Sequence, residues 1–205
     1  MGNNGPHFAD VSRWALGCDT FPEAVSCAGG TLFDRGGDFE WPDFYNASFR
    51  YPNGKFITFE MTCHCNEKPY LESATGAMVY GTKGSVWFGL QDDVKVFDKD
   101  SKLIRGWAAG GVESAVSTPL PLNNPTQALD VRHLEDFVTN IRNRTQTTRA
   151  DADIGVKSSL LPIYANIAAD AGETLRIDPR TGKCLSKDGT DKWSREYAKG
   201  WELPA

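Results

Sequence analysis

The chain has 205 residues, of which 40% are hydrophobic and 11% aromatic, so it is long enough to bury a sizeable core. Its net charge of −5 arises from 27 acidic and 22 basic residues without a basic block, which argues against a nucleic-acid partner. No apolar run approaches the roughly 20 residues that span a bilayer. Residues 1–14 also lack the basic start and apolar centre of a secretory signal. We therefore expect a cytoplasmic protein with no membrane partner.

The cysteines are too few and too unevenly spaced for a disulfide framework. An odd number in a chain of this length predicts free, mostly buried thiols in a reducing compartment. The tripeptide Cys63-His64-Cys65 is a poor metal site, because alternate side chains of a strand point to opposite faces. We expect no metal. The five cysteines are Cys18, Cys27, Cys63, Cys65 and Cys184.

The first half of the chain predicts one helix followed by a run of strands. The helix covers Pro6–Leu16 and ends at Gly17. Pro52-Asn53-Gly54 is a strong hairpin signal, and Gly81–Gly84 predicts a second tight turn. Strands that follow one another this closely, without helices between them, form an antiparallel meander. The expected strands are Glu23–Phe33, Phe44–Tyr51, Phe56–Cys65, Met78–Thr82, Ser85–Leu90 and Val94–Asp98.

The second half is predominantly helical. A connection over Gly106–Pro125 leads into a helix whose apolar face carries Leu134, Phe137, Val138 and Ile141. A second helix covers Asp153–Ala171, where Pro162 should kink it or shift its start. A short strand at Leu175–Ile177 follows. We expect the tail to pack on the body through Trp193, Tyr197 and Trp201.

This order of elements predicts an α+β fold, with a largely antiparallel open sheet and helices on one face. We expect a single domain over residues 1–205. The other face of the sheet carries many large apolar residues and is a candidate interface for a homo-oligomer. Examples are Phe44, Phe49, Trp87 and Phe88.

One segment brings together side chains suited to proton transfer. His7 and Asp10 are three residues apart on the first predicted helix and should share a face, with Asn3 a further turn before His7. An imidazole beside a carboxylate and an amide is suited to moving a proton and binding a hydroxyl. A structural histidine near a helix start remains the alternative. His133, without an acid–base partner in the sequence pattern, is interpreted as structural.

The order of several segments resembles the C-terminal domain of the Gfo/Idh/MocA oxidoreductases, in particular the bacterial-type subgroup. The resemblance covers essentially the whole chain. Each motif is loose alone, but their joint order is specific. The segments are GNNGPHFADVSRWALG, AVSCAGG, WPDFYNASFRYPNGKFITFE, VYGTKGSVWF, HLEDFVTNIRNR, LPIYANIAADAGETLRIDP and WSREYAKGWEL.

The resemblance implies a substrate-binding and oligomerisation domain that works with an N-terminal Rossmann domain carrying NAD or NADP. It implies that His7 is the catalytic histidine and that Asn3 occupies a position where many members have aspartate. Asp10 and Arg13 match the pattern after the histidine, as substrate-binding or supporting residues. The family also has a catalytic lysine in a Glu-Lys-Pro motif upstream of the histidine. Glu67-Lys68-Pro69 lies downstream, so we do not equate the two.

The sequence contains no GxGxxG and no parallel βαβ pattern, so we expect the dinucleotide-binding domain to be absent and no cofactor to be bound by this chain alone. The leading hypothesis is the C-terminal half of an oxidoreductase acting on a sugar, polyol or related hydroxy compound, not redox-active alone. Its Rossmann domain would be supplied in cis or in trans. The alternatives are a non-catalytic carbohydrate-binding or oligomerisation module, and a catalyst of elimination or hydration with His7 as general base.

Overall fold

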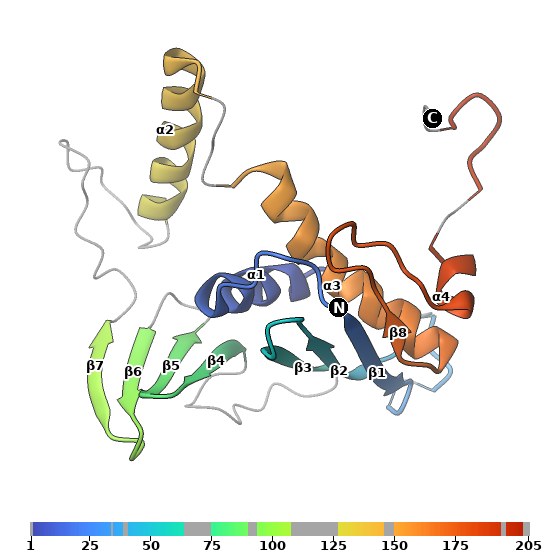
Figure 1. Ribbon diagram of the computed structural model, residues 1–205, viewed down its shortest axis with the longest axis horizontal. Coiled ribbons are helices and arrows are strands. Elements are labelled where there is room, and N and C mark those ends of the chain that lie inside the picture. The colour runs from blue at the N-terminus through green and yellow to red at the C-terminus, as the bar shows by residue number, and fades with distance from the viewer. Residues whose placement is uncertain are drawn as a thin grey trace. The chain divides into compact units, whose positions relative to one another are not determined.

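The computed structural model of the protein describes residues 2–33, 35–38, 41–63, 75–89, 94–107, 127–145, 150–193 and 196–202 (Figure 1). The chain divides into two compact units. The first contains residues 1–9, 16–65 and 157–205, and the second contains residues 10–15 and 66–156.

The first unit is built on a four-stranded antiparallel sheet with the order β3-β2-β1-β8. Its register pairs Val25 with Phe49, and Phe49 with Ile57, so these three side chains share the face that forms the core. The prediction of strands here is confirmed. The bounds are β1 at Ala24–Gly30, β2 at Phe44–Arg50, β3 at Phe56–Thr62 and β8 at Leu175–Arg176.

The predicted hairpin between β2 and β3 is confirmed. The Tyr51 amide donates to the Lys55 carbonyl at 2.9 Å, and the Gly54 amide donates to the Tyr51 carbonyl at 3.0 Å. Gly54 has a φ of 78°, a left-handed conformation that glycine adopts without steric cost. This turn fixes the register of β2 and β3 and positions Lys55, whose role at the end of the first helix is described below.

The core of the first unit lies between this sheet and helix α3, Ala152–Ala171. Leu161, Tyr164 and Ala168 of α3 are at most 1% exposed, and α3 continues through Pro162. The Tyr164 hydroxyl donates to the Gly182 carbonyl at 2.6 Å. The Tyr164 ring stacks on Trp193 with centroids 5.3 Å apart.

The tail is only partly packed as predicted. Trp193, which follows the short helix α4 at Lys187–Asp191, packs against the core cluster. Trp201 is 79% exposed and Tyr197 37% exposed, so the expectation that all three aromatic residues anchor the tail was wrong for Trp201. The Trp201 amide donates to the Ala198 carbonyl at 2.9 Å in a local turn.

A buried carboxylate organises the loop that follows β1. Asp43 is 4% exposed, and its two oxygens accept the amides of Leu32 at 2.9 Å and Phe33 at 2.8 Å. Backbone amides that donate to a buried carboxylate offset part of the cost of removing its charge from water. Asp43 therefore acts as a structural residue of the first unit.

The second unit contains its own four-stranded antiparallel sheet, with the order β4-β5-β6-β7, together with helix α2 at Gln127–Asn143. The predicted tight turn is confirmed, because Gly81 pairs with Gly84 at the end of the hairpin. The α+β class and the antiparallel strands are also confirmed, although the strands form two sheets. The bounds are β4 at Gly76–Gly81, β5 at Gly84–Gly89, β6 at Val94–Asp98 and β7 at Leu103–Trp107.

Two of the residues that suggested an apolar outer face point into the core. Phe49 and Trp87 are each 3% exposed, so the expectation that they contribute to an exposed sheet face was wrong. Large apolar side chains at alternate strand positions pack inward when that face is covered. The exposed apolar residues of the second sheet are instead Tyr80, Leu103 and Ile104.

The cysteines of the described part of the chain are free thiols, as predicted: Cys18 and Cys184 are buried, Cys27 is half-buried and Cys63 is exposed. Burial raises the pKa of the Cys27 thiol to about 11. The other two residues of the Cys63-His64-Cys65 tripeptide, and the Glu67-Lys68-Pro69 turn, lie outside the described residues. Within the described ranges, no three His, Cys, Asp or Glu residues cluster as metal ligands. No described helix is long and apolar enough to cross a bilayer.

Candidate functional site

The candidate site is carried by the first helix, α1, at Gly5–Leu16. Pro6 lies in the first turn, where its missing amide hydrogen is not needed, and Gly17 follows the last residue with a φ of 61°. The side-chain amine of Lys55 donates to the Leu16 carbonyl, so a cation lies at the negative end of the helix dipole. Both ends of α1 are therefore well defined.

The side of α1 that is buried explains which residues remain available. Gly5, Ala9, Ser12 and Arg13 are buried and lie along one side of the helix. His7 and Trp14 are exposed, and Asp10 is half-buried. Because positions three and four residues apart stack on a helix, His7, Asp10 and Trp14 form one row on the opposite side. We call these three residues the α1 row.

The structure places two of the predicted site residues on the same side of one helix. His7 and Asp10 lie one turn apart on α1, as the spacing predicts. Asn3 is exposed and lies in the turn before Gly5, where the helix begins, so it flanks the row and is not part of it.

Trp14, to which no role was assigned from the sequence, also lies on the α1 row, and its side chain is 77% exposed. The signal that could have found it is its spacing, since it follows His7 by two helical turns and Asp10 by one.

Arg13 differs from the other predicted site residues because it is only 5% exposed. Its Nη1 donates to the Ile154 carbonyl at 3.4 Å and lies 3.9 Å from an Asp10 carboxylate oxygen. All three residues belong to the second unit. A buried guanidinium that bonds a carbonyl in the first turn of α3 fastens α1 to that helix. This geometry favours a supporting role for Arg13 over direct contact with a substrate.

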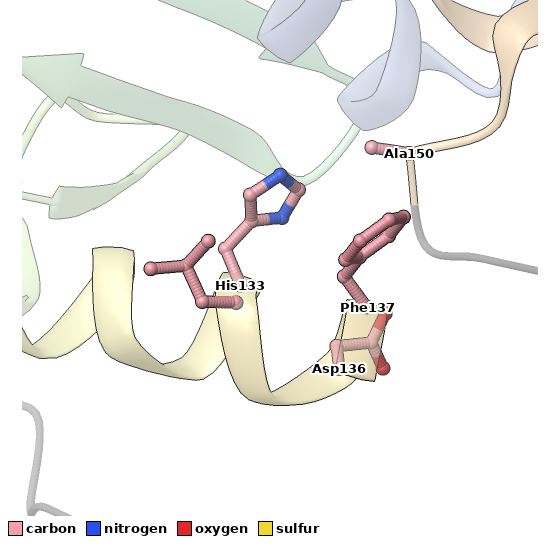
Figure 2. A pocket seen from close by; sticks show the side chains of 5 residues that line it. His133, Asp136, Phe137 and Ala150 are labelled. Atoms are coloured by element: carbon pink, nitrogen blue, oxygen red, sulfur yellow. The ribbon is translucent and has the colours of Figure 1, made fainter. Parts of the chain in front are cut away.

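The second unit also has a pocket along α2 (Figure 2). Its polar members are His133 and Asp136, one turn apart on α2. Figure 2 shows the His133 and Phe137 rings extending toward Ala150, whereas the Asp136 carboxylate lies away from the His133 ring. The pocket therefore offers one imidazole in largely apolar surroundings, a weaker basis for proton transfer than the α1 row. Its lining consists of His133, Leu134, Asp136, Phe137 and Ala150.

Comparison with known proteins finds one family model that matches the N-terminal part of the chain. A family model of the GFO/IDH/MocA C-terminal domain matches residues 1–87, which include all of α1 and the strands β1 to β4. No match is found among curated proteins.

Several solved oxidoreductases have a similar fold. Levoglucosan dehydrogenase in complex with NADH and levoglucosan is 18% identical, with a TM-score of 0.61 over 85% of this chain and 49% of that chain. An oxidoreductase from Agrobacterium radiobacter in complex with NAD+, L-tartaric acid and magnesium is 14% identical. Its TM-score is 0.57 over 84% of this chain and 47% of that chain. The WlbA dehydrogenase from Bordetella pertussis, in complex with NADH and UDP-GlcNAcA, is 18% identical. Its TM-score is 0.51 over 86% of this chain and 44% of that chain.

The chain thus spans about half the length of the solved structures that it matches. Identities of this size establish a common fold and do not transfer a substrate. Residues 1–87 match the model of the GFO/IDH/MocA C-terminal domain, and the chain has the α+β fold of the C-terminal part of these oxidoreductases.

Proposed function

We propose that this chain is the substrate-side half of an NAD(P)-dependent oxidoreductase that acts on a sugar, polyol or related hydroxy compound. The observation that carries the proposal is the α1 row, in which an exposed imidazole lies one turn from a carboxylate. Support comes from the fold, which this chain has in common with oxidoreductases solved with NADH and levoglucosan or with NADH and UDP-GlcNAcA.

In this proposal His7 accepts the proton of the substrate hydroxyl at an imidazole nitrogen. Asp10 and Asn3 bind neighbouring hydroxyls and orient the substrate against His7. Arg13 holds α1 in place through its hydrogen bond to the Ile154 carbonyl. Because Asn3 carries an amide, which is not a base, the proton transfer is assigned to His7 alone.

The described residues do not fit a nicotinamide dinucleotide. Such a site needs a parallel strand that leads through a Gly-rich turn into a helix N-terminus. Within the described part of the chain, every strand pairing is antiparallel. We therefore assign the cofactor to a Rossmann domain in cis or in trans and derive no hydride step for this chain.

A fusion protein tests the proposal. The part of the levoglucosan dehydrogenase chain that lies outside the match is placed before residue 2 of this chain, and NADH formation from NAD+ is followed with a panel of sugars and polyols. We expect the isolated chain to form no NADH and the fusion to form it with at least one compound. Circular dichroism of both proteins shows that each is folded. A folded fusion that is inactive on the whole panel would count against the proposal.

We further propose that the chain forms a homo-oligomer through the outer face of the second sheet. Tyr80 and Leu103 lie on one face of that sheet, because Tyr80 pairs with Ser85, Ser85 with Phe97, and Phe97 with Leu103. They are 77% and 53% exposed, which supports an apolar interface there. Light scattering of the purified chain should give a mass of at least a dimer. Replacing Leu103 with Lys should shift the mass toward the monomer, whereas a monomeric parent chain contradicts the proposal.

A further inference from the structure

Trp14 is the residue of the α1 row that the proposed reaction does not use. A single exposed aromatic residue is ordinary on a protein surface and needs no explanation. Trp14, however, is 77% exposed on the helical row that also carries His7 and Asp10, opposite the buried side of α1. Because the row lies on one continuous helix, the spacing of its members follows from helix geometry alone.

The row combines two kinds of contact that a sugar needs. The face of an indole carries a negative quadrupole, which attracts the C–H groups on the apolar face of a pyranose. The Asp10 carboxylate accepts hydrogen bonds from hydroxyls and begins one helical turn, about 6 Å, before Trp14. A polypeptide partner would be expected to need a broader apolar surface than one indole flanked by a carboxylate and an imidazole.

The spacing also sets the size of the ligand. Trp14 follows His7 by seven positions, which corresponds to about 10 Å along the helix axis. A single hexopyranose does not span this distance, so a ring stacked on Trp14 is not the ring whose hydroxyl meets His7. The substrate that fits the whole row has two linked rings.

We propose that Trp14 is a sugar-stacking residue that extends the site by one ring beyond His7, so that the preferred substrate is a disaccharide. This inference rests on the proposed function for the identity of the first ring. The contact of Trp14 with the second ring is a binding interaction and takes no part in the chemistry.

The experiment titrates the purified full chain, labelled with 15N at the tryptophan indoles, with cellobiose and separately with methyl β-D-glucoside. The chain has six tryptophans, and the Trp14 indole signal is assigned from its loss in Trp14→Phe. We expect cellobiose to shift this signal and to bind about tenfold more weakly to Trp14→Ala, the loss expected for one aromatic contact. Trp14→Phe should keep most of the affinity, and the one-ring glucoside should shift the signal far less.

Trp201→Ala is the matched control, because Trp201 is 79% exposed and lies outside α1. This variant should bind cellobiose like the parent chain. The inference is overturned if cellobiose leaves the Trp14 signal unmoved, or if Trp14→Ala binds as tightly as the parent. It is also overturned if the signal responds only to protein concentration, since Trp14 would then face a second copy.

The outcomes separate this inference from the proposed function. If cellobiose binds through Trp14 but the fusion forms no NADH with any compound, the stacking residue stands and the oxidoreductase proposal fails. If the fusion oxidises single-ring sugars as well as disaccharides, and Trp14→Ala leaves both rates unchanged, the oxidoreductase proposal stands and the stacking residue fails.

Discussion

Replacing His7 with Ala in the fusion protein is expected to lower kcat/KM by about 10²- to 10⁴-fold, the usual contribution of a general acid or base. His7 is exposed on α1, and Asp10 one turn away provides a carboxylate beside it. Removing the imidazole takes away the only group assigned to the hydroxyl proton. The substrate KM should change much less than kcat, because Asn3, Asp10 and Trp14 still bind the substrate.

The matched control is His133→Ala. His133 is also exposed, but it lies on α2, in the pocket that Phe137 and Ala150 also line. Steady-state NADH formation is measured for the fusion protein and for its His7→Ala and His133→Ala variants, and the three rates are compared. His133→Ala should remain within about twofold of the parent, in keeping with a surface substitution away from the chemistry. If His7→Ala also retains the parent rate, His7 has no role in proton transfer under any of the catalytic schemes considered.

The largest loss of stability is expected from Leu161→Ala, which should lower the free energy of unfolding by about 2–5 kcal/mol. Leu161 is 1% exposed in α3 and belongs to the core cluster of the first unit. The substitution removes buried apolar surface and leaves a cavity that the sheet and α3 cannot fill without moving.

Urea denaturation followed by far-ultraviolet circular dichroism measures this loss. Leu134→Ala is the control, since Leu134 is 62% exposed on α2 and its truncation should change the unfolding free energy by less than about 0.5 kcal/mol. The denaturation slope should stay the same in both variants if only stability changes. Equal effects of the two substitutions would mean that the core of the first unit is not where the structure places it.

The sequence predicts those elements whose signals are local. The β2–β3 hairpin follows from Pro52-Asn53-Gly54, where only glycine adopts the left-handed position without cost. Strand β7 was not predicted, because the turn that leads into it is held by an aspartate side chain and contains no glycine. The Asp98 carboxylate accepts the amides of Asp100 and Lys102, and Ser101 has a φ of 63°. The division into two sheets depends on long-range pairing, which no short window of sequence contains.

For the candidate site, too, the sequence predicts local spacing and not the packing between distant segments. The spacing of His7 and Asp10 along α1 could be read from the sequence, but which side of the helix is buried could not. Arg13 is a charged residue in a buried position, contrary to the usual preference, and its carbonyl partner Ile154 lies far along the chain. Trp14, the more hydrophobic side chain, is the exposed one. Only tertiary packing decides which of these two neighbouring side chains is buried.

The most direct test of the central claim compares NADH formation by the isolated chain, by the fusion protein and by the fusion carrying His7→Ala, with the same sugars and NAD+. The account predicts no NADH from the isolated chain, NADH from the fusion, and a rate at least a hundredfold lower after the substitution. NADH formed by the isolated chain would contradict the assignment of the cofactor to another domain. A folded fusion that binds sugars but forms no NADH would instead identify a non-catalytic carbohydrate-binding module.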